Sequence, residues 1–178
     1  MMEKLKKLEK DYKLNPVQKI LLTTDGSITR ILEAFTGDRV RVETVTQEII
    51  KADKNIKDAL GINRGDEVNF RVVNLMAQDR VLIHAVSYTP LNRLKKEFRE
   101  DIMKKDVPIG TIMARLKMEA RREIKDFQVI KADQGLSGVF QLPAGTLLLK
   151  RNYDIIHENK VMMNITEIFP FDLEQELP

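Results

Sequence analysis

The stretch Val161-Met162-Met163-Asn164-Ile165-Thr166-Glu167-Ile168-Phe169 decides the fold prediction, because its composition and alternation are typical of a β-strand. Side chains along a strand point alternately to its two faces. Glu167 therefore shares the more apolar face with every second residue, Val161, Met163, Ile165 and Phe169. A carboxylate on such a face needs a hydrogen-bond donor or a cation. This placement is typical of a binding site, although a structural ion pair gives the same pattern.

Further strands lie on both sides of this stretch. Residues 146–156 read as a strand that joins it through a short turn, which predicts a hairpin. Residues 67–76 and 80–88 predict a second hairpin, closed by Ala77-Gln78-Asp79. Two more alternating runs cover residues 39–50, with a bend near Thr44-Val45, and residues 122–131. The expectation is a sheet of about six antiparallel strands.

Helical spacing of apolar residues fills most of the remaining chain. It predicts helices over residues 2–14, from Pro16 onward, over 28–35, over 55–60, over 91–102 and from Ile109 onward. Residues 134–138 are glycine-rich and are expected to form a loop. No internal repeat is apparent. The sequence predicts one α+β domain over residues 1–178, with helices packed largely on one side of the sheet, a pocket between the layers, and an acidic tail at 172–178.

Composition excludes several classes of site. The 178 residues include no cysteine, no tryptophan and two histidines, so disulfides, thiol nucleophiles and conventional zinc sites are not expected. With 30 basic and 27 acidic residues the charge is almost balanced, and the lysine-rich start is better explained by a solvated helix face than by a nucleic-acid-binding arm. No apolar run has the length of a membrane span or of a signal peptide. We expect a cytoplasmic protein, of a composition seen in thermophiles.

Arg71 is the second candidate site residue. It lies among apolar neighbours in the strand predicted at 67–76, where it either extends to solvent or presents its planar guanidinium to a carboxylate. An apolar cavity with Arg71 and Glu167 would suit a small anionic ligand that also carries a hydroxyl group. A structural pair between the two residues remains the alternative.

Two helix starts and one further arginine are weaker candidates. The segment Thr24-Asp25-Gly26-Ser27 precedes a helix, and Pro108-Ile109-Gly110 opens another, so both offer free N–H groups to an anion. An ordinary capped helix is the favoured explanation of both. Arg122 can either reach an anion or favour the end of the preceding helix.

These motifs, taken in order, resemble the chorismate pyruvate-lyase superfamily, most closely its archaeal and mycobacterial branch. The resemblance rests on Asp25-Gly26-Ser27-Ile28-Thr29-Arg30, a strand with Arg71, Pro108-Ile109-Gly110, and Thr166-Glu167-Ile168-Phe169-Pro170. It covers roughly residues 15–171 and leaves the first helix, 1–14, outside.

The resemblance implies a reaction that converts chorismate into 4-hydroxybenzoate and pyruvate without metal or organic cofactor. It implies that Arg71 grips the ring carboxylate, assisted by the backbone N–H of Ile109. It further implies that Glu167 meets the ring hydroxyl, and that the backbone of Ile28 lies at that same end. Arg122 is a hypothesis for the second carboxylate of the substrate.

Two alternatives to the lyase remain open at this point. The same superfamily fold serves as the effector-sensing (UTRA) domain of bacterial transcription regulators, which binds a small molecule without chemistry. A sheet-mediated scaffold is the third possibility, and it predicts a filled core in which Arg71 and Glu167 pair with each other.

Overall fold

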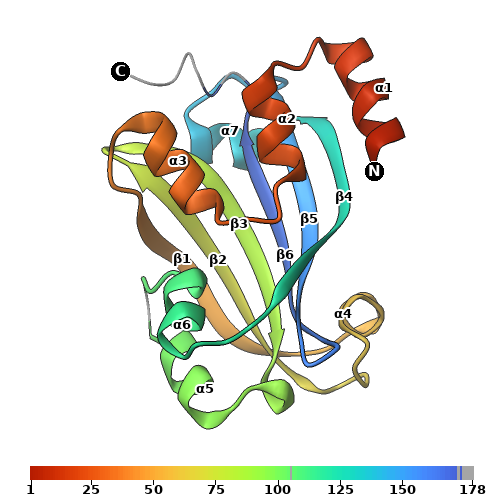
Figure 1. Ribbon diagram of the computed structural model, residues 1–178, viewed down its shortest axis with the longest axis vertical. Coiled ribbons are helices and arrows are strands. Elements are labelled where there is room, and N and C mark those ends of the chain that lie inside the picture. Colours follow the sequence, from red (N-terminus) through yellow and green to blue (C-terminus); the bar gives the residue numbers. More distant parts are fainter. Residues whose placement is uncertain (105, 172, 174–178) are drawn as a thin grey trace.

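A single six-stranded antiparallel sheet organises the molecule (Figure 1). The computed structural model describes residues 1–104, 106–171 and 173, so the predicted acidic tail lies almost entirely outside the described residues. The strand order is β1-β2-β3-β6-β5-β4. The strands are β1 (Arg41–Lys51), β2 (Glu67–Ala77), β3 (Arg80–Pro90), β4 (Arg121–Lys131), β5 (Leu147–His157) and β6 (Lys160–Pro170). The predicted α+β class and both predicted hairpins are confirmed.

The chain contains an internal repeat, which the sequence analysis missed. The order strand, short helix, strand, strand occurs twice, and the second copy begins each element 80 residues after the first: 41 and 121, 54 and 134, 67 and 147, 80 and 160. Both copies carry a register shift at the same place, between Thr44 and Thr46 and between Ile124 and Asp126. The first of these is the bend predicted near Thr44-Val45.

The two repeats meet at the centre of the sheet, where β3 pairs with β6. Val86 pairs there with Thr166, its own counterpart, and the pairs on either side are related by the same exchange of halves. The sheet therefore has an approximate twofold axis, perpendicular to it, through this central pair. Each residue of one half therefore has a counterpart on the same face of the sheet, on the opposite side of the axis.

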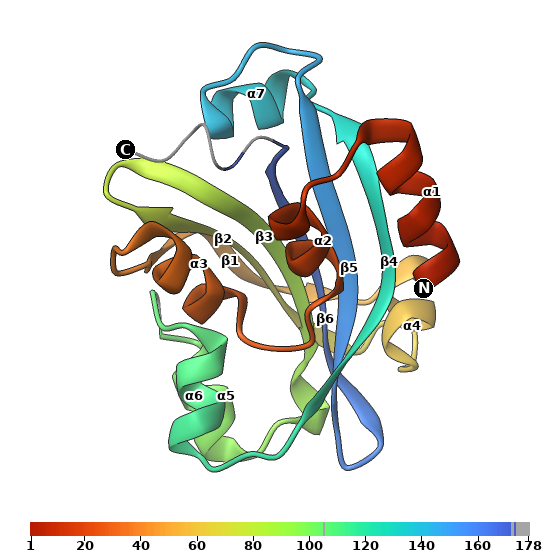
Figure 2. The same ribbon diagram turned by 45° about the horizontal axis from the view of Figure 1, so that its top comes forward.

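Five helices cover what we call the front face, the face that carries Arg71 and Glu167 (Figure 2). They are α1 (Met2–Tyr12), α2 (Pro16–Thr23), α3 (Ile28–Thr36), α5 (Lys96–Ile102) and α6 (Ile109–Arg115). The helices α2 and α3 bury Leu21, Leu22 and Leu32 against Leu149 and Phe169 of the sheet. The pair α5 and α6 forms a second core with β5 and β6. A short 3₁₀ turn, η1 (Leu91–Arg93), leads from β3 toward α5.

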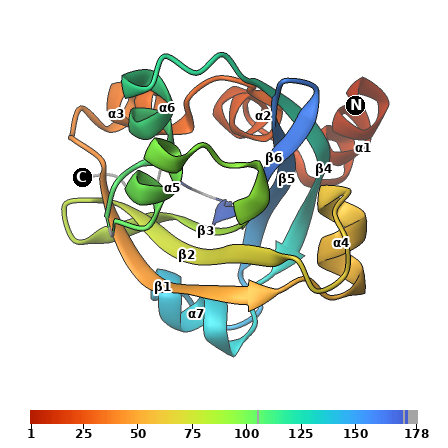
Figure 3. The ribbon, with the colours of Figure 1, turned by 90° about the horizontal axis from the view of Figure 1, so that it is seen from below.

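Two short helices pack on the opposite face at its two ends, α4 (Lys54–Leu60) and α7 (Gln134–Phe140) (Figure 3). The expectation of a loop at 134–138 is wrong, since these residues form most of α7. Glycine is a poor helix former, but Asp133 caps the helix by accepting a hydrogen bond from the Leu136 N–H, and Phe140 is buried. Asp53 caps α4 in the same way through the Ile56 N–H.

No helix in the described part of the chain combines the length and the apolar character that a membrane crossing requires.

Candidate ligand-binding site

The structure places Arg71 and Glu167 on the same face of the sheet. Residues paired across antiparallel strands share a face, and Arg71 pairs with Ser87, which in turn pairs with Ile165, two residues before Glu167 on β6. Strand β3 lies between the two site strands, so the backbones of β2 and β6 are about 10 Å apart. Both side chains are buried, with 1% of Arg71 and 4% of Glu167 exposed. The alternative in which Arg71 extends to solvent is therefore wrong.

Glu167 accepts hydrogen bonds from two neighbours on β5. The Arg151 Nε donates to Oε2 at 2.6 Å, and the Tyr153 hydroxyl donates to Oε1 at 2.9 Å. The Arg151 guanidinium lies 5.0 Å from the centre of the Tyr153 ring. The three side chains thus form one buried cluster. The structural ion pair expected for Glu167 exists, but its partner is Arg151 and not Arg71.

Tyr153 is held in its neutral form by this cluster. Burial raises the pKa of its phenol above the ordinary value, and the Glu167 carboxylate raises it further, while Arg151 and Arg122 act in the opposite direction. A neutral phenol keeps its proton and can donate it in a hydrogen bond to the carboxylate. Tyr153 therefore orients Glu167 at all pH values near neutrality.

Arg71 is buried without a carboxylate bonded to its guanidinium in the described residues. Its Nη1 donates to the Val107 carbonyl at 3.1 Å and its Nη2 to the Thr44 hydroxyl at 3.3 Å. Its Nε is buried and has no hydrogen-bond partner among the described residues. Burial lowers the pKa of Arg71 from its ordinary value, and the nearby Asp106 carboxylate partly offsets that effect.

The repeat explains why Arg71 and Arg151 differ. They are counterparts 80 residues apart, and each pairs with a residue of the next strand: Arg151 with Glu167, and Arg71 with Ser87. The carboxylate that satisfies the Nε of Arg151 thus has a serine as its counterpart beside Arg71. An unpaired buried donor is costly, so this Nε is suited to an anion from outside the chain.

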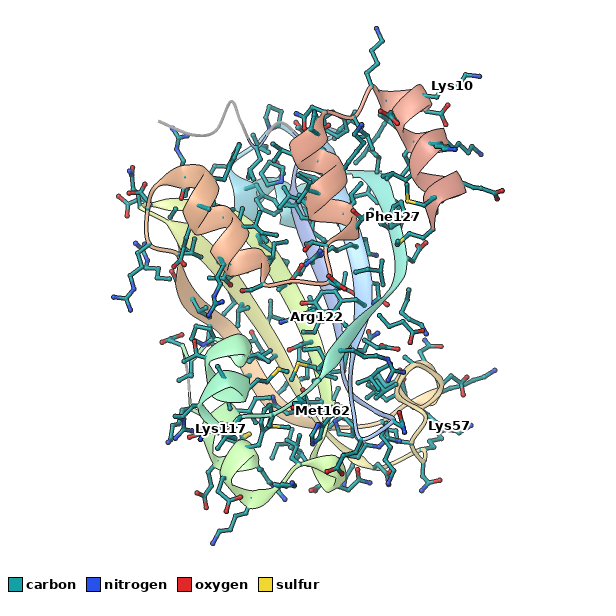
Figure 4. The ribbon with its side chains drawn as sticks, viewed as in Figure 1. Lys10, Lys57, Lys117, Arg122, Phe127 and Met162 are labelled. Atoms are coloured by element: carbon teal, nitrogen blue, oxygen red, sulfur yellow. The ribbon has the colours of Figure 1, made fainter. Side chains whose placement is uncertain are left out.

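The two helical groups bring the remaining candidates to the same face. Ile28 is the first residue of α3 and follows the N-cap residue Ser27. Ile109 is the first residue of α6 and follows Pro108. Arg122 donates through Nη1 to the Asp25 carbonyl at 3.2 Å, and Figure 4 shows it between the α1–α3 group and the α5–α6 group. All five predicted residues therefore belong to the front face or to segments that cover it.

Two hollows of the described chain lie away from the predicted pocket between the layers. One hollow, of about 360 Å³, is lined by Asp66, Arg93 and Lys160 near α4. The other, of about 200 Å³, is lined by Phe98, Leu116 and His157. Neither is lined by any of the five predicted site residues. Both hollows are therefore separate from the predicted site.

The sequence analysis missed Arg151, Tyr153, Thr44 and Ser87. A signal for the repeat was available, because Ile50-Lys51-Ala52-Asp53 recurs as Ile130-Lys131-Ala132-Asp133. Aligning the two copies from this tetrapeptide places Arg71 over Arg151 and Ser87 over Glu167. That alignment would have identified Arg151 as the counterpart of Arg71 and so as a candidate site residue.

Comparison with known proteins agrees with this architecture. The family model described as "Chorismate pyruvate-lyase Rv2949c-like" matches residues 22–177, beginning later than the expected residue 15. The chain is 37% identical to the Methanocaldococcus jannaschii protein named "Putative lyase MJ0807", over 94% of this chain and 85% of that one. It is 25% identical to the chorismate pyruvate-lyase of Mycobacterium leprae, over 99% of this chain and 81% of that one.

The solved structures give the fold relationship. PhnF from Mycobacterium smegmatis matches with a TM-score of 0.70 at 15% identity, over 83% of this chain and 64% of that one. Its effector domain alone matches with a TM-score of 0.69 at 13% identity, and this chain spans 90% of it. The predicted fold relationship between this chain and effector domains is confirmed. The chain belongs to the Rv2949c-like chorismate pyruvate-lyase family.

Proposed function

We propose that this protein is a chorismate pyruvate-lyase that releases pyruvate from chorismate and leaves 4-hydroxybenzoate. The observation that carries the proposal is the pair of buried arginines: Glu167 neutralises Arg151, whereas the counterpart of Glu167 beside Arg71 is Ser87. Arg71 keeps a buried Nε donor for an external anion. A ring carboxylate there, with the backbone N–H of Ile109 as a second donor, would leave the other end of the ring toward Glu167.

Glu167 retains the capacity to bind the ring hydroxyl. Each carboxylate oxygen has two lone-pair positions, and each accepts one hydrogen bond in the structure, from Arg151 and from Tyr153. The backbone of Ile28 would lie at this hydroxyl end. Arg122 is proposed to bind the second carboxylate of chorismate once its contact with the Asp25 carbonyl is exchanged.

The proposed chemistry needs few groups. The ether C–O bond of the enolpyruvyl group breaks, the hydroxyl-bearing ring carbon loses its hydrogen as a proton, and the enolpyruvate gains a proton to become pyruvate. The ring becomes aromatic, so the reaction is strongly downhill. The protein then has to orient chorismate and exclude water.

A second candidate function, ligand binding without catalysis, is supported by the shared fold and by the hydrogen bonds of Glu167. PhnF shares the fold and contains a domain described as an effector domain, and both oxygens of Glu167 already have partners in this chain. A domain that binds a small aromatic carboxylate without converting it would fit the same geometry. The scaffold alternative predicted a pair between Arg71 and Glu167, and the Arg151–Glu167 pair contradicts that prediction.

Turnover separates the lyase from the effector-binding domain. We expect purified protein mixed with chorismate to produce 4-hydroxybenzoate, followed by its absorbance. Absence of product under conditions in which a known lyase works would exclude the catalytic proposal. Calorimetric binding of 4-hydroxybenzoate without turnover would then identify the effector-binding function.

Variants test the two proposed anchors. We expect Arg71→Ala and Glu167→Gln each to weaken 4-hydroxybenzoate binding or kcat/KM at least about tenfold, or about 1.4 kcal/mol. Arg93→Ala is the matched control, because Arg93 also donates to two backbone carbonyls, of Leu60 and Val161, but beside α4. Thermal unfolding is measured for all three, since losing one member of a buried ion pair costs about 3–5 kcal/mol. Unchanged binding in both site variants would place the ligand elsewhere.

A further inference from the structure

Arg151 connects the proposed acid to the segment that covers it. Its side chain is 1% exposed. While its Nε donates to Glu167, its Nη1 donates to the Leu21 carbonyl at 2.7 Å and to the Thr24 carbonyl at 3.0 Å. The Leu21 carbonyl lies near the end of α2. The Thr24 carbonyl lies at the start of residues 24–27, which we call the α2–α3 turn. One guanidinium therefore contacts both Glu167 of β6 and the segment that covers it.

The contact with α2 has a clear physical origin. The last carbonyls of a helix lack partners within the helix, and the C-terminal end of its dipole attracts a cation. Arg151 supplies both the donors and the positive charge at the end of α2. The α2–α3 turn then leads directly into Ser27 and Ile28 at the start of α3.

The charge of Arg151 depends on Glu167 for compensation. A buried guanidinium without its carboxylate is strongly unfavourable. A change at Glu167 therefore alters the energy of Arg151, and this change reaches the α2 carbonyls through Nη1. Because such coupling is reciprocal, opening of the α2–α3 turn must also alter the placement of Glu167.

We propose that Arg151 is a positioning residue that couples the placement of the Glu167 carboxylate to closure of the α2–α3 turn over the ligand. Its catalytic consequence rests on the proposed lyase function. The coupling between Glu167 and the turn does not, because both are present in the protein without ligand. Arg71, the counterpart of Arg151, donates instead to the Val107 carbonyl ahead of α6, so in the described residues the contact with the α2–α3 turn comes from Arg151.

Hydrogen exchange tests the coupling directly. We expect the amide protons of residues 21–28 to exchange at least about tenfold faster in Arg151→Lys and in Glu167→Gln than in the wild type. Lysine keeps the positive charge but cannot donate in two fixed directions. Arg93→Lys is the matched control, because it removes the same fork from carbonyls beside α4 and should leave this segment unchanged.

The pattern of exchange decides between coupling and a purely local role. If Glu167→Gln leaves residues 21–28 as protected as in the wild type, the proposal is wrong, even if Arg151→Lys exposes them. If Arg151→Lys does not fold, the effect of Glu167→Gln on these amides still decides. This measurement uses no substrate, so a failure of the lyase proposal is seen separately, in the wild-type assay with chorismate.

Steady-state kinetics adds a readout for the catalytic consequence. In a protein that turns over chorismate, Arg151→Lys should lower kcat at least about tenfold while KM changes less than about threefold, because the loss concerns closure and orientation. Arg71→Ala should instead raise KM. An Arg151→Lys variant with wild-type kcat would overturn the positioning role.

Discussion

The protonation of Tyr153 is strongly constrained by its surroundings. Burial raises the pKa of its phenol above the ordinary value of 10.0, with a further increase from Glu167. The folded protein therefore holds this proton at a pH where the unfolded chain loses it. The resulting stabilisation is complete below about pH 10 and is lost as the pH rises further toward the folded pKa, with a slope of about 1.4 kcal/mol per pH unit.

Replacing Tyr153 with phenylalanine should remove this alkaline sensitivity. Between pH 9 and pH 11 we expect the free energy of unfolding of the wild type to fall by about 1.4 kcal/mol more than that of Tyr153→Phe. Urea unfolding at both pH values measures the difference. Tyr12→Phe is the matched control, since Tyr12 on α1 is 38% exposed. Equal losses in the wild type and in Tyr153→Phe would show that the phenol is not held neutral in the cluster.

At the scale of elements, the two caps on the back face are equivalent devices. Asp53 begins α4 and Asp133 begins α7, each by accepting a hydrogen bond from the N–H three residues later, at 2.8 Å in both cases. An unpaired N–H at a helix start otherwise depends on water. The caps therefore compensate for short helices that have little intrinsic stability.

Removing either cap should destabilise the protein to a similar degree. We expect Asp53→Ala and Asp133→Ala each to lower the free energy of unfolding by about 1 kcal/mol. Asp58→Ala is the control, because Asp58 lies within α4 and does not cap it. Among the described residues, its ion pair is with its neighbour Lys57. Urea midpoints at constant m-value provide the measurement. If Asp133→Ala leaves the free energy of unfolding unchanged, the cap does not stabilise α7, and its packing through Phe140 is sufficient.

The elements also show what a sequence can and cannot reveal. Strand alternation placed Glu167 on the more apolar face of its strand and Arg71 among apolar neighbours, because period-two patterns do not depend on how the strands pair. The partner of Glu167 depends on strand register, which no local pattern specifies, and so Arg151 was missed. The helix at 134–140 was missed because its glycines outweighed a cap and one buried aromatic residue that act only in the folded protein.

At the scale of the whole molecule, the approximate twofold axis makes one half a control for the other. Arg151 with Glu167 and Arg71 with Ser87 occupy equivalent positions on the front face. In one half, Glu167 neutralises the charge of Arg151. In the other half, the Nε of Arg71 is buried without a hydrogen-bond partner in the described residues. The proposed ligand would thus complete, with its own carboxylate, an arrangement that the chain already builds once.

This equivalence predicts the effect of a single exchange. In Ser87→Glu, the new carboxylate should reach Arg71 as Glu167 reaches Arg151, and it should compete with the ligand carboxylate for the guanidinium. We expect 4-hydroxybenzoate to bind at least about tenfold more weakly to Ser87→Glu than to Ser87→Gln, by calorimetry. Ser87→Gln is the matched control, because Ser87 is 5% exposed and both larger side chains carry a similar packing cost of about 1–3 kcal/mol. Equal affinities in the two variants would show that the anion does not bind Arg71, since a negative charge beside its site would then have no effect.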